Sequence, residues 1–295
     1  LDTWVQRVTG VPMEPRAAVG EFDPATGRYT IHAGSGGAFR QKREISIILG
    51  VEIDDVRVIA KDVGGNFGTR NSFYPEFAMV AWAAKRIGRP VKWTSDRTEA
   101  FLSDHQGRDL RVEAELALDA DGNFIGLRGA NISNVGAHTV SFVPLAKGAE
   151  IMSGTYRIPA CYVRARAAMT NTASTSPYRS AGRPEVNFVI ERLVDLAARE
   201  TGFDPVELRR RNIIPADAMP YANGLGMTYD SGDYPKALDE ALALGDVDGF
   251  AARKAGSAAL GKRRGLGIAS YMETSTGAPR ERTEMTVVPP ERDEN

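Results

Sequence analysis

The sequence predicts an α+β fold with mixed sheets and helices packed against them. Segments typical of strands and of helices are interleaved irregularly, and a hairpin turn joins at least two neighbouring strands. The chain has 295 residues, of which 42% are hydrophobic and 25% charged, as in ordinary globular domains. A doubly wound parallel sheet is disfavoured because its strands and helices would alternate regularly.

The first elements are two strands with a helix between them. Residues 27–33 and 56–61 are rich in β-branched residues and are bounded by turn formers, as strands are. Residues 40–49 carry apolar residues at helical spacing before a glycine. Residues 75–88 are a clear helix, because a proline opens it, basic residues occupy its last turn and a glycine follows. Its apolar residues wrap most of the circumference, which predicts a largely buried helix.

The middle of the chain is expected to be mainly strand. The expected strands span 91–96, 110–118, 124–135 and 162–169, and residues 119–122 form the hairpin turn. Residues 96–99 are expected to be a turn with an ion pair, and residues 106–108 a loop. Residues 148–160 show no clear periodicity.

The last third is expected to begin with a strong helix. Pro184 opens it, an apolar i, i+3, i+4 stripe follows, and Gly202 ends it. Asp204 is a typical N-cap for the next helix. The other expected elements are helices at 205–211, 234–244 and 247–258, an irregular connection at 213–233, strands at 265–273 and 282–288, and a loose tail at 289–295.

Composition and charge exclude several classes of function. The formal net charge is −1, so the bulk charge gives no attraction to nucleic acid or to an anionic membrane. No apolar run approaches the roughly 20 residues that span a bilayer, and no signal peptide is evident, so a cytoplasmic location is expected. The single cysteine, Cys161, excludes a disulfide or a cysteine-ligated iron–sulfur cluster held by this chain alone. The three histidines lack metal-ligand spacing.

A glycine-rich loop at residues 63–70 surrounds one aromatic residue, Phe67. Gly64, Gly65 and Gly68 allow positive φ and a close approach of the backbone to a ligand. The spacing fits neither a P-loop nor a dinucleotide-binding fingerprint. An ordinary glycine turn is one interpretation, and a loop whose N–H groups and aromatic ring lie against a cofactor is the other.

A second glycine-bearing loop, residues 176–185, precedes the strong helix. A helix N-terminus favours anions, and Arg179 and Arg183 could add charge-assisted hydrogen bonds to phosphate or to a substrate oxyanion. Alternatively, both arginines are solvated or pair with Glu185 and Glu191. Each loop carries an aromatic residue and an arginine, so we expect the two loops to converge on one anionic, planar or phosphate-bearing ligand.

The order of these segments resembles the molybdenum-binding large subunit of the xanthine dehydrogenase family, which includes aldehyde oxidases and aerobic carbon monoxide dehydrogenases. The resemblance runs through nearly the whole chain. It rests on Gly64-Gly65-Asn66-Phe67-Gly68, a helix, Arg89-Pro90-Val91-Lys92, Asp96-Arg97, Tyr178-Arg179-Ser180-Ala181-Gly182-Arg183-Pro184-Glu185 and Glu191-Arg192.

This resemblance implies a molybdopterin-dependent hydroxylase of an aldehyde or N-heteroaromatic substrate, which takes its oxygen from water. The implied cofactor is molybdenum on molybdopterin, in its cytosine dinucleotide form. The implied partners are an iron–sulfur small subunit with 2Fe–2S clusters and a medium subunit with FAD, and neither group is expected on this chain. The cofactor would supply the redox chemistry and the protein would bind and orient it.

The resemblance also assigns roles to residues of the two loops. Those implied to bind the cofactor are Gly64, Gly65, Phe67, Gly68, Tyr178, Arg179, Ser180 and Ala181. Arg179 and Phe67 are implied to be catalytic, because positive charge at Arg179 would stabilise a developing oxyanion. No protein ligand to molybdenum is implied, since the pterin dithiolene holds the metal. Ser180 stands where carbon monoxide dehydrogenases have a copper-binding cysteine, so we expect no copper site.

Length suggests that the chain is a fragment or one piece of a split subunit. We expect residues 1–245 to form the first molybdenum-cofactor-binding domain, and residues 246–295 to form a linker helix and the beginning of the second. The family's catalytic glutamate lies nearer the C-terminus of a full subunit, so the chain is expected to need the rest of the large subunit and to be inactive alone. The alternatives are a non-catalytic scaffold or assembly module with the same fold and, less directly, a binder of phosphate ligands.

Overall fold

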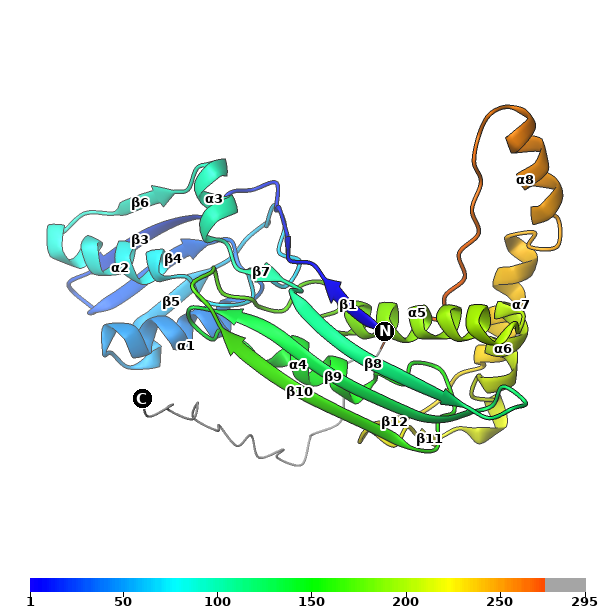
Figure 1. The fold of residues 1–295 in the computed structure, drawn as a ribbon. Helices are drawn as coiled ribbons and strands as arrows, with labels where there is room; N and C mark the ends of the chain where they lie inside the picture. Colours follow the sequence, from blue (N-terminus) through cyan, green and yellow to red (C-terminus); the bar gives the residue numbers. More distant parts are fainter. Residues whose placement is uncertain (274–295) are drawn as a thin grey trace, which may run out of the picture.

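Two four-stranded sheets, each packed against helices, carry the fold (Figure 1). This arrangement is taken from a computed structural model that describes residues 1–273. Strands and helices mix in both halves, so the predicted α+β class is confirmed. Each half has its own cluster of buried apolar side chains, and the chain starts in the half of the second sheet, crosses to the first and returns.

The first sheet has the strand order β5-β4-β3-β6 and is covered by two helices. Its elements are β3 (Ala17–Asp23), β4 (Arg28–Ala33), β5 (Val56–Ile59), β6 (Val91–Thr94), α1 (Ala38–Leu49) and α2 (Pro75–Ile87). β4 and β5 are parallel, whereas β3 is antiparallel to both of its neighbours. Gly20 on β3 lets α2 come close, since a Cβ there would lie 2.5 Å from the Val80 carbonyl carbon.

The second sheet is longer and has the strand order β1-β8-β9-β10. Its elements are β1 (Asp2–Val5), β8 (Leu110–Leu118), β9 (Phe124–Gly136) and β10 (Cys161–Met169), packed against α4 (Val143–Glu150) and α5 (Arg183–Thr201). The predicted hairpin joins β8 to β9, and β10 runs parallel to β9. Val112 of β8 and Val186 and Ile190 of α5 are fully buried in the core between them.

Shorter elements complete the chain. They are β2 (Val8–Thr9), η1 (Ile53–Asp55), α3 (Arg97–Ser103), β7 (Gln106–Gly107), α6 (Pro205–Asn212), η2 (Ala216–Ala218), β11 (Tyr221–Ala222), β12 (Thr228–Tyr229), α7 (Tyr234–Leu244) and α8 (Phe250–Ala259). α8 projects away from both sheets (Figure 1). Within residues 1–273, no helix combines the length and apolar character needed to cross a bilayer.

The predicted helix ends are confirmed. Gly50, Gly88 and Gly202 follow α1, α2 and α5 in the left-handed conformation, with φ of 67°, 65° and 81°. The Asp204 side chain caps α6 by accepting hydrogen bonds from two backbone N–H groups, at 2.9 and 3.0 Å. These local signals therefore fixed where three helices stop and where a fourth begins.

Several sequence-based predictions about elements are wrong. Residues 106–108, expected to be a loop, include β7, which pairs with β2. Residues 265–273 are not a strand, because the part from Leu266 to Tyr271 lines a groove beside α7 instead of pairing with a neighbouring strand. Residues 96–99 are not a simple turn, since Asp96 accepts from the Glu99 N–H at 2.7 Å and caps α3. α2 is not largely buried, because one of its faces exposes Met79, Trp82 and Ile87.

Other differences concern elements that the sequence pattern did not predict. β1, β3 and α4 were not expected, and α8 begins three residues later than the predicted start at 247. The strand expected at 282–288 and the tail at 289–295 lie outside the described residues.

Candidate functional site

The two predicted loops meet where the two halves of the molecule join. Residues 63–70 connect β5 to α2 in the first half, and residues 176–182 connect β10 to α5 in the second. The backbone N–H of Arg179 donates a hydrogen bond to the Phe67 carbonyl, with an N···O distance of 2.8 Å. Gly68 is in direct contact with the second loop, because a Cβ there would lie 2.5 Å from the Pro177 carbonyl oxygen. The two loops therefore lie against each other at this junction, and their convergence on a common ligand stays a prediction.

Strained backbone is concentrated at this junction. Among the described residues, seven non-glycine residues have positive φ, and five of them lie here: Phe67 (54°), Arg108 (64°), Asp109 (70°), Arg179 (22°) and Ser180 (71°). A non-glycine residue in this region costs roughly 1–3 kcal/mol and persists only where its surroundings hold it. The site keeps an aromatic side chain and a cationic side chain at positions where glycine would be less strained.

The glycines of the first loop serve contacts within the protein. Gly64 exchanges two hydrogen bonds with Glu14: its N–H donates to the carboxylate at 2.8 Å, and its carbonyl accepts from the Glu14 N–H at 3.1 Å. A Cβ on Gly64 would lie 2.4 Å from the Glu14 Cβ. Gly65 has φ of 122° and lies close to Pro12. Residues 12–14 therefore hold the first loop in place.

Some side chains of the two loops pack inside the protein, and others are exposed at its surface. Tyr178 packs on Gly107, where a Cβ would lie 2.4 Å from the Tyr178 Cβ, and Ala181 is buried. Phe67 is 40% exposed, and Arg179 is also exposed. Of the predicted site residues, Phe67 and Arg179 are therefore the two that offer large side chains to a ligand.

The Ser180 hydroxyl contacts residues far along the chain. Its Oγ lies 3.1 Å from the Tyr271 hydroxyl, and it also hydrogen-bonds the Glu273 carboxylate. Glu273 forms an ion pair with Arg183 as well. The segment after α8 thus returns to the second loop and closes one side of it.

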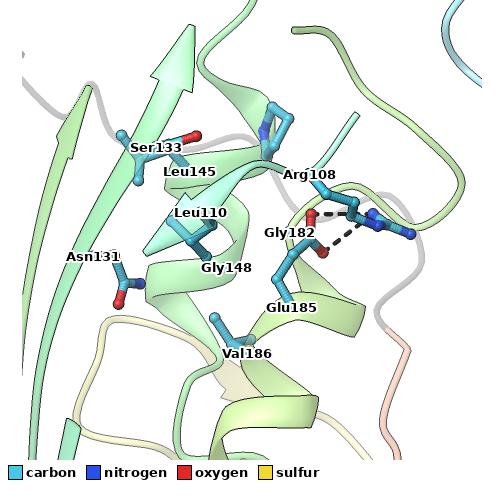
Figure 2. A pocket seen from close by; sticks show the side chains of 10 residues that line it. Arg108, Leu110, Asn131, Ser133, Leu145, Gly148, Gly182, Glu185 and Val186 are labelled. Carbon is cyan, nitrogen blue, oxygen red and sulfur yellow. Dashed lines mark hydrogen bonds and ion pairs between the residues drawn. The ribbon is translucent and has the colours of Figure 1, made fainter. Parts of the chain in front are cut away.

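Sequence reasoning missed Arg108, which holds the second loop from inside. Its guanidinium donates to the carbonyl oxygens of Tyr178 and Arg179, both at 2.9 Å. It also donates to both carboxylate oxygens of Glu185 at 3.1 Å, as Figure 2 shows. Burial raises the pKa of Glu185, and the charge of Arg108 opposes that rise. A charged residue in left-handed backbone between β7 and β8 is a signal that only the structure reveals.

The alternative pairing for the loop arginines is wrong. Glu185 pairs with Arg108, and Glu191 pairs with Arg209 at 2.8 Å. Both glutamates lie on the buried side of α5, so they face arginines of the core and not those of the exposed loop. Arg179 therefore keeps its charge available at the surface.

The cavity beside the Arg108–Glu185 ion pair is small. Arg108, Glu185 and Gly182 line it together with polar groups of β9, including Asn131, and with apolar groups of α4 (Figure 2). Its volume is about 10 Å³, which matches about one water molecule. A pterin could not enter it, so this cavity is not the site of a ligand of that size.

A buried polar network supports the first loop. The Tyr74 hydroxyl donates to the Thr69 carbonyl at 3.0 Å and accepts from the His105 N–H at 2.9 Å. The His105 ring stacks on Tyr74 with 4.3 Å between centroids. Burial, with help from the nearby Arg16, lowers the pKa of His105 to about 4, so this histidine is neutral at pH 7. Its role here is structural.

Nothing in the described part of the chain gathers three or more His, Cys, Asp or Glu side chains as a metal site would. The exposed, strained loops offer instead an aromatic face, a cation and backbone dipoles. Such groups suit a planar anionic ligand that brings its own metal.

Comparison with known proteins agrees with this chemistry. The profile of the molybdopterin cofactor-binding domain family matches residues 2–213, which include both loops. This chain belongs to that family. The matched residues include both loops. These loops lie in separate halves of the molecule and are joined by the hydrogen bond from the Arg179 N–H to the Phe67 carbonyl.

The curated proteins that the chain resembles include subunits of dehydrogenases. The chain is 36% identical to subunit gamma of the 6-hydroxypseudooxynicotine dehydrogenase complex of Paenarthrobacter nicotinovorans, over 90% of this chain and 34% of that protein. It is 32% identical to the carbon monoxide dehydrogenase large chain of Hydrogenophaga pseudoflava, over 92% of this chain and 35% of that protein. The chain therefore spans about one third of the length of these relatives.

Among solved structures, the chain is similar to quinoline 2-oxidoreductase from Pseudomonas putida 86. The TM-score is 0.82 with 29% sequence identity, and the alignment covers 88% of this chain and 34% of that chain. The relatives are molybdenum-dependent oxidoreductases, and the resemblance to the xanthine dehydrogenase family is confirmed.

Proposed function

We propose that this chain is the first molybdenum-cofactor-binding domain of a molybdenum hydroxylase large subunit, and that its two converging loops hold the cofactor. The observation that carries the proposal is the hydrogen bond between the Arg179 N–H and the Phe67 carbonyl, at 2.8 Å, which joins two strained loops from separate halves. When bound, the molybdenum cofactor would supply the oxidation of an aldehyde or N-heteroaromatic carbon with oxygen from water.

In this proposal the residues of the chain bind and orient. Phe67 presents its ring to the planar cofactor, and the loop glycines Gly64, Gly65 and Gly68 keep the backbone of the first loop close to it. Arg179 places a positive charge where negative charge develops on the substrate oxygen. Tyr178, Ser180 and Ala181 keep Arg179 in place by packing and hydrogen bonding.

Further polypeptide would complete the site. Phe67 and Arg179 lie on the surface of this chain, so the remainder of a large subunit would supply the opposite wall and the catalytic base. We propose that the chain is inactive alone, with residues 1–245 as the cofactor-binding domain and residues 246–295 leading into a second one. An iron–sulfur subunit and a flavoprotein subunit would accept the electrons in the cytoplasm. The pterin would carry a cytosine nucleotide.

Metal and pterin analysis of the complete complex tests the proposal. The complex should contain molybdenum, and should release a fluorescent pterin and a cytosine nucleotide on oxidation. It should oxidise N-heteroaromatic or aldehyde substrates, whereas this chain alone should not. A complex that is stable and folded but free of molybdenum and pterin would support the scaffold alternative and refute the enzyme.

Copper analysis tests a finer point of the same proposal. A serine hydroxyl is a poor ligand for soft copper, so Ser180 predicts no stoichiometric copper and no efficient oxidation of carbon monoxide. Stoichiometric copper bound through the second loop would overturn this prediction. A Ser180→Cys variant of the complex is the matched test of whether the loop can bind copper at all.

A further inference from the structure

The second loop depends on one side chain that lies outside it. Arg108 follows β7 and precedes β8, and only 11% of its side chain is exposed. Its five N–H groups form a fixed fork, which suits two neighbouring acceptors better than the single ammonium of lysine does. Here the fork reaches two consecutive peptide carbonyls, those of Tyr178 and Arg179, at 2.9 Å each.

Each of these two carbonyls directly precedes a strained residue of the loop. Arg179 and Ser180 have φ of 22° and 71°, and the carbonyls of Tyr178 and Arg179 belong to the peptide bonds that precede them. Fixing both carbonyls orients both peptide planes. The guanidinium therefore acts on the two residues whose conformation decides where the Arg179 side chain is directed.

Arg108 is itself held from two sides. The Glu185 carboxylate, with 3% of its side chain exposed, neutralises it and fixes its fork in place. The next residue, Asp109, accepts hydrogen bonds from Trp4 at 3.1 Å, Arg7 at 2.9 Å and Asn134 at 2.9 Å. The strained pair Arg108 and Asp109 is thus tied to β1 and β9, and the clamp has a rigid base.

We propose that Arg108 is a positioning residue that holds the second loop in its strained conformation and so directs Arg179 toward the ligand. The role in catalysis rests on the proposed function, while the clamp on the loop can be tested without it. Glu185 acts through Arg108, because it contacts the guanidinium and lies on the inner side of the loop (Figure 2).

The test uses Arg108→Lys in the complete complex. Hydrogen–deuterium exchange would be followed in peptides that cover residues 177–183, in the cofactor-free and in the loaded complex. The Ala181 and Arg183 N–H groups, which donate to Tyr178 and Ser180 carbonyls at 3.0 and 3.1 Å, report on the loop. Their exchange should become at least about 10-fold faster in the variant, because the single ammonium nitrogen of lysine does not replace both Nη1, which reaches the Tyr178 carbonyl and Glu185, and Nη2, which reaches the Arg179 carbonyl.

Arg209→Lys is the matched control. Arg209 is also buried and also pairs with a glutamate of α5, Glu191 at 2.8 Å, but none of its hydrogen bonds reaches the second loop. It should leave exchange in residues 177–183 unchanged. Glu185→Gln gives a milder version of the change, since it removes the counter-charge but keeps the side-chain volume, and it should speed exchange less than Arg108→Lys does.

Kinetics decide whether the clamp positions Arg179 for the reaction. Arg108→Lys should lower kcat by about 10-fold or more with little change in KM and with molybdenum content retained, because positioning affects the transition state more than binding. Equal exchange in the variant and the wild type, or equal acceleration in the Arg209→Lys control, would overturn the clamp. Faster exchange with unchanged kcat would overturn the positioning role. A wild-type complex without molybdenum would refute the proposed function, and the cofactor-free exchange would still decide the clamp.

Discussion

Left-handed backbone at three helix ends differs from left-handed backbone at the junction of the two halves. At the ends of α1, α2 and α5 it falls on Gly50, Gly88 and Gly202, where a Cβ would meet nothing within 4 Å. At the junction of the two halves it falls on Phe67, Arg179 and Ser180, in loops packed against each other. The helix ends use the residue that tolerates the conformation, whereas the junction keeps side chains that do not.

The difference separates local structure from function. A helix end needs only the turn, so glycine is sufficient there. The junction holds an aromatic ring and a cation at a conformational cost, and strain of this kind concentrates where side chains serve a ligand. Its support comes from other parts of the chain: Arg108, paired with Glu185 of α5, holds the second loop, and Glu14 holds the first.

The largest expected effect comes from the presented cation. Arg179→Ala in the complete complex should lower kcat by about 10²–10³-fold, as loss of a group that stabilises an oxyanion does. Molybdenum content and steady-state kinetics would measure it. Arg199→Ala, at the exposed far end of α5, is the control and should change neither quantity. A normal kcat in Arg179→Ala would remove this arginine from the reaction.

Two glycine substitutions compare the settings directly. Gly68→Ala should destabilise the fold by about 3 kcal/mol or more, because φ is 91° and the new Cβ would lie 2.5 Å from the Pro177 oxygen. Gly88→Ala meets open space at φ of 65° and should cost about 1 kcal/mol. Denaturant unfolding of both variants provides the measurement. Similar losses would show that the junction is no more tightly packed than a helix end.

Acid sensitivity tests the support of the first loop. His105 has its pKa lowered from 6.5 to about 4, so the unfolded chain binds its proton more readily than the folded chain does. The stabilisation from neutral His105 is complete above pH 6.5 and is lost as the pH falls toward 4. It amounts to at most about 3 kcal/mol. His105→Phe keeps a ring on Tyr74 and should flatten unfolding free energy over this pH range, and an unchanged pH profile would contradict a buried neutral histidine.

The smallest expected effect is an increase in the free energy of unfolding instead of a decrease. Phe67→Gly should relieve the left-handed strain and raise the free energy of unfolding by about 1 kcal/mol or less, since glycine also gains freedom in the unfolded chain. Phe67→Gly should also bind less cofactor than the wild type. Phe67→Leu should lose less of the bound cofactor than Phe67→Gly does. Calorimetry and pterin release measure the two effects. If the glycine variant is less stable and binds pterin normally, the aromatic side chain serves the fold alone.

The sequence predicted elements best where local chemistry decides them. Caps and periodicity placed α2, α5 and α7, since proline, glycine and an apolar stripe are local signals. The strand predicted at 265–273 failed because pairing depends on a neighbour that sequence alone does not reveal. The prediction that α2 is largely buried failed for a related reason. The apolar residues on its exposed face suit burial, but nothing in the described chain covers them.

In the candidate site too, local patterns could be predicted from the sequence and long-range contacts could not. The two loops could be predicted because glycines, an aromatic residue and arginines stand together in each. Their contact through Phe67 and Arg179 was expected and is present. Arg108 could not be predicted, because its role depends on a side chain reaching a loop 70 residues away. Long-range clamps of this kind leave no local pattern.

Hydrogen–deuterium exchange of the complete complex, with and without cofactor, tests the central claim most directly. Peptides covering residues 63–70 and 177–183 should become protected together when the cofactor is bound, while peptides that cover the helix ends at Gly88 and Gly202 should exchange at the same rate in both states. If the cofactor binds and neither loop gains protection, these loops do not form its site.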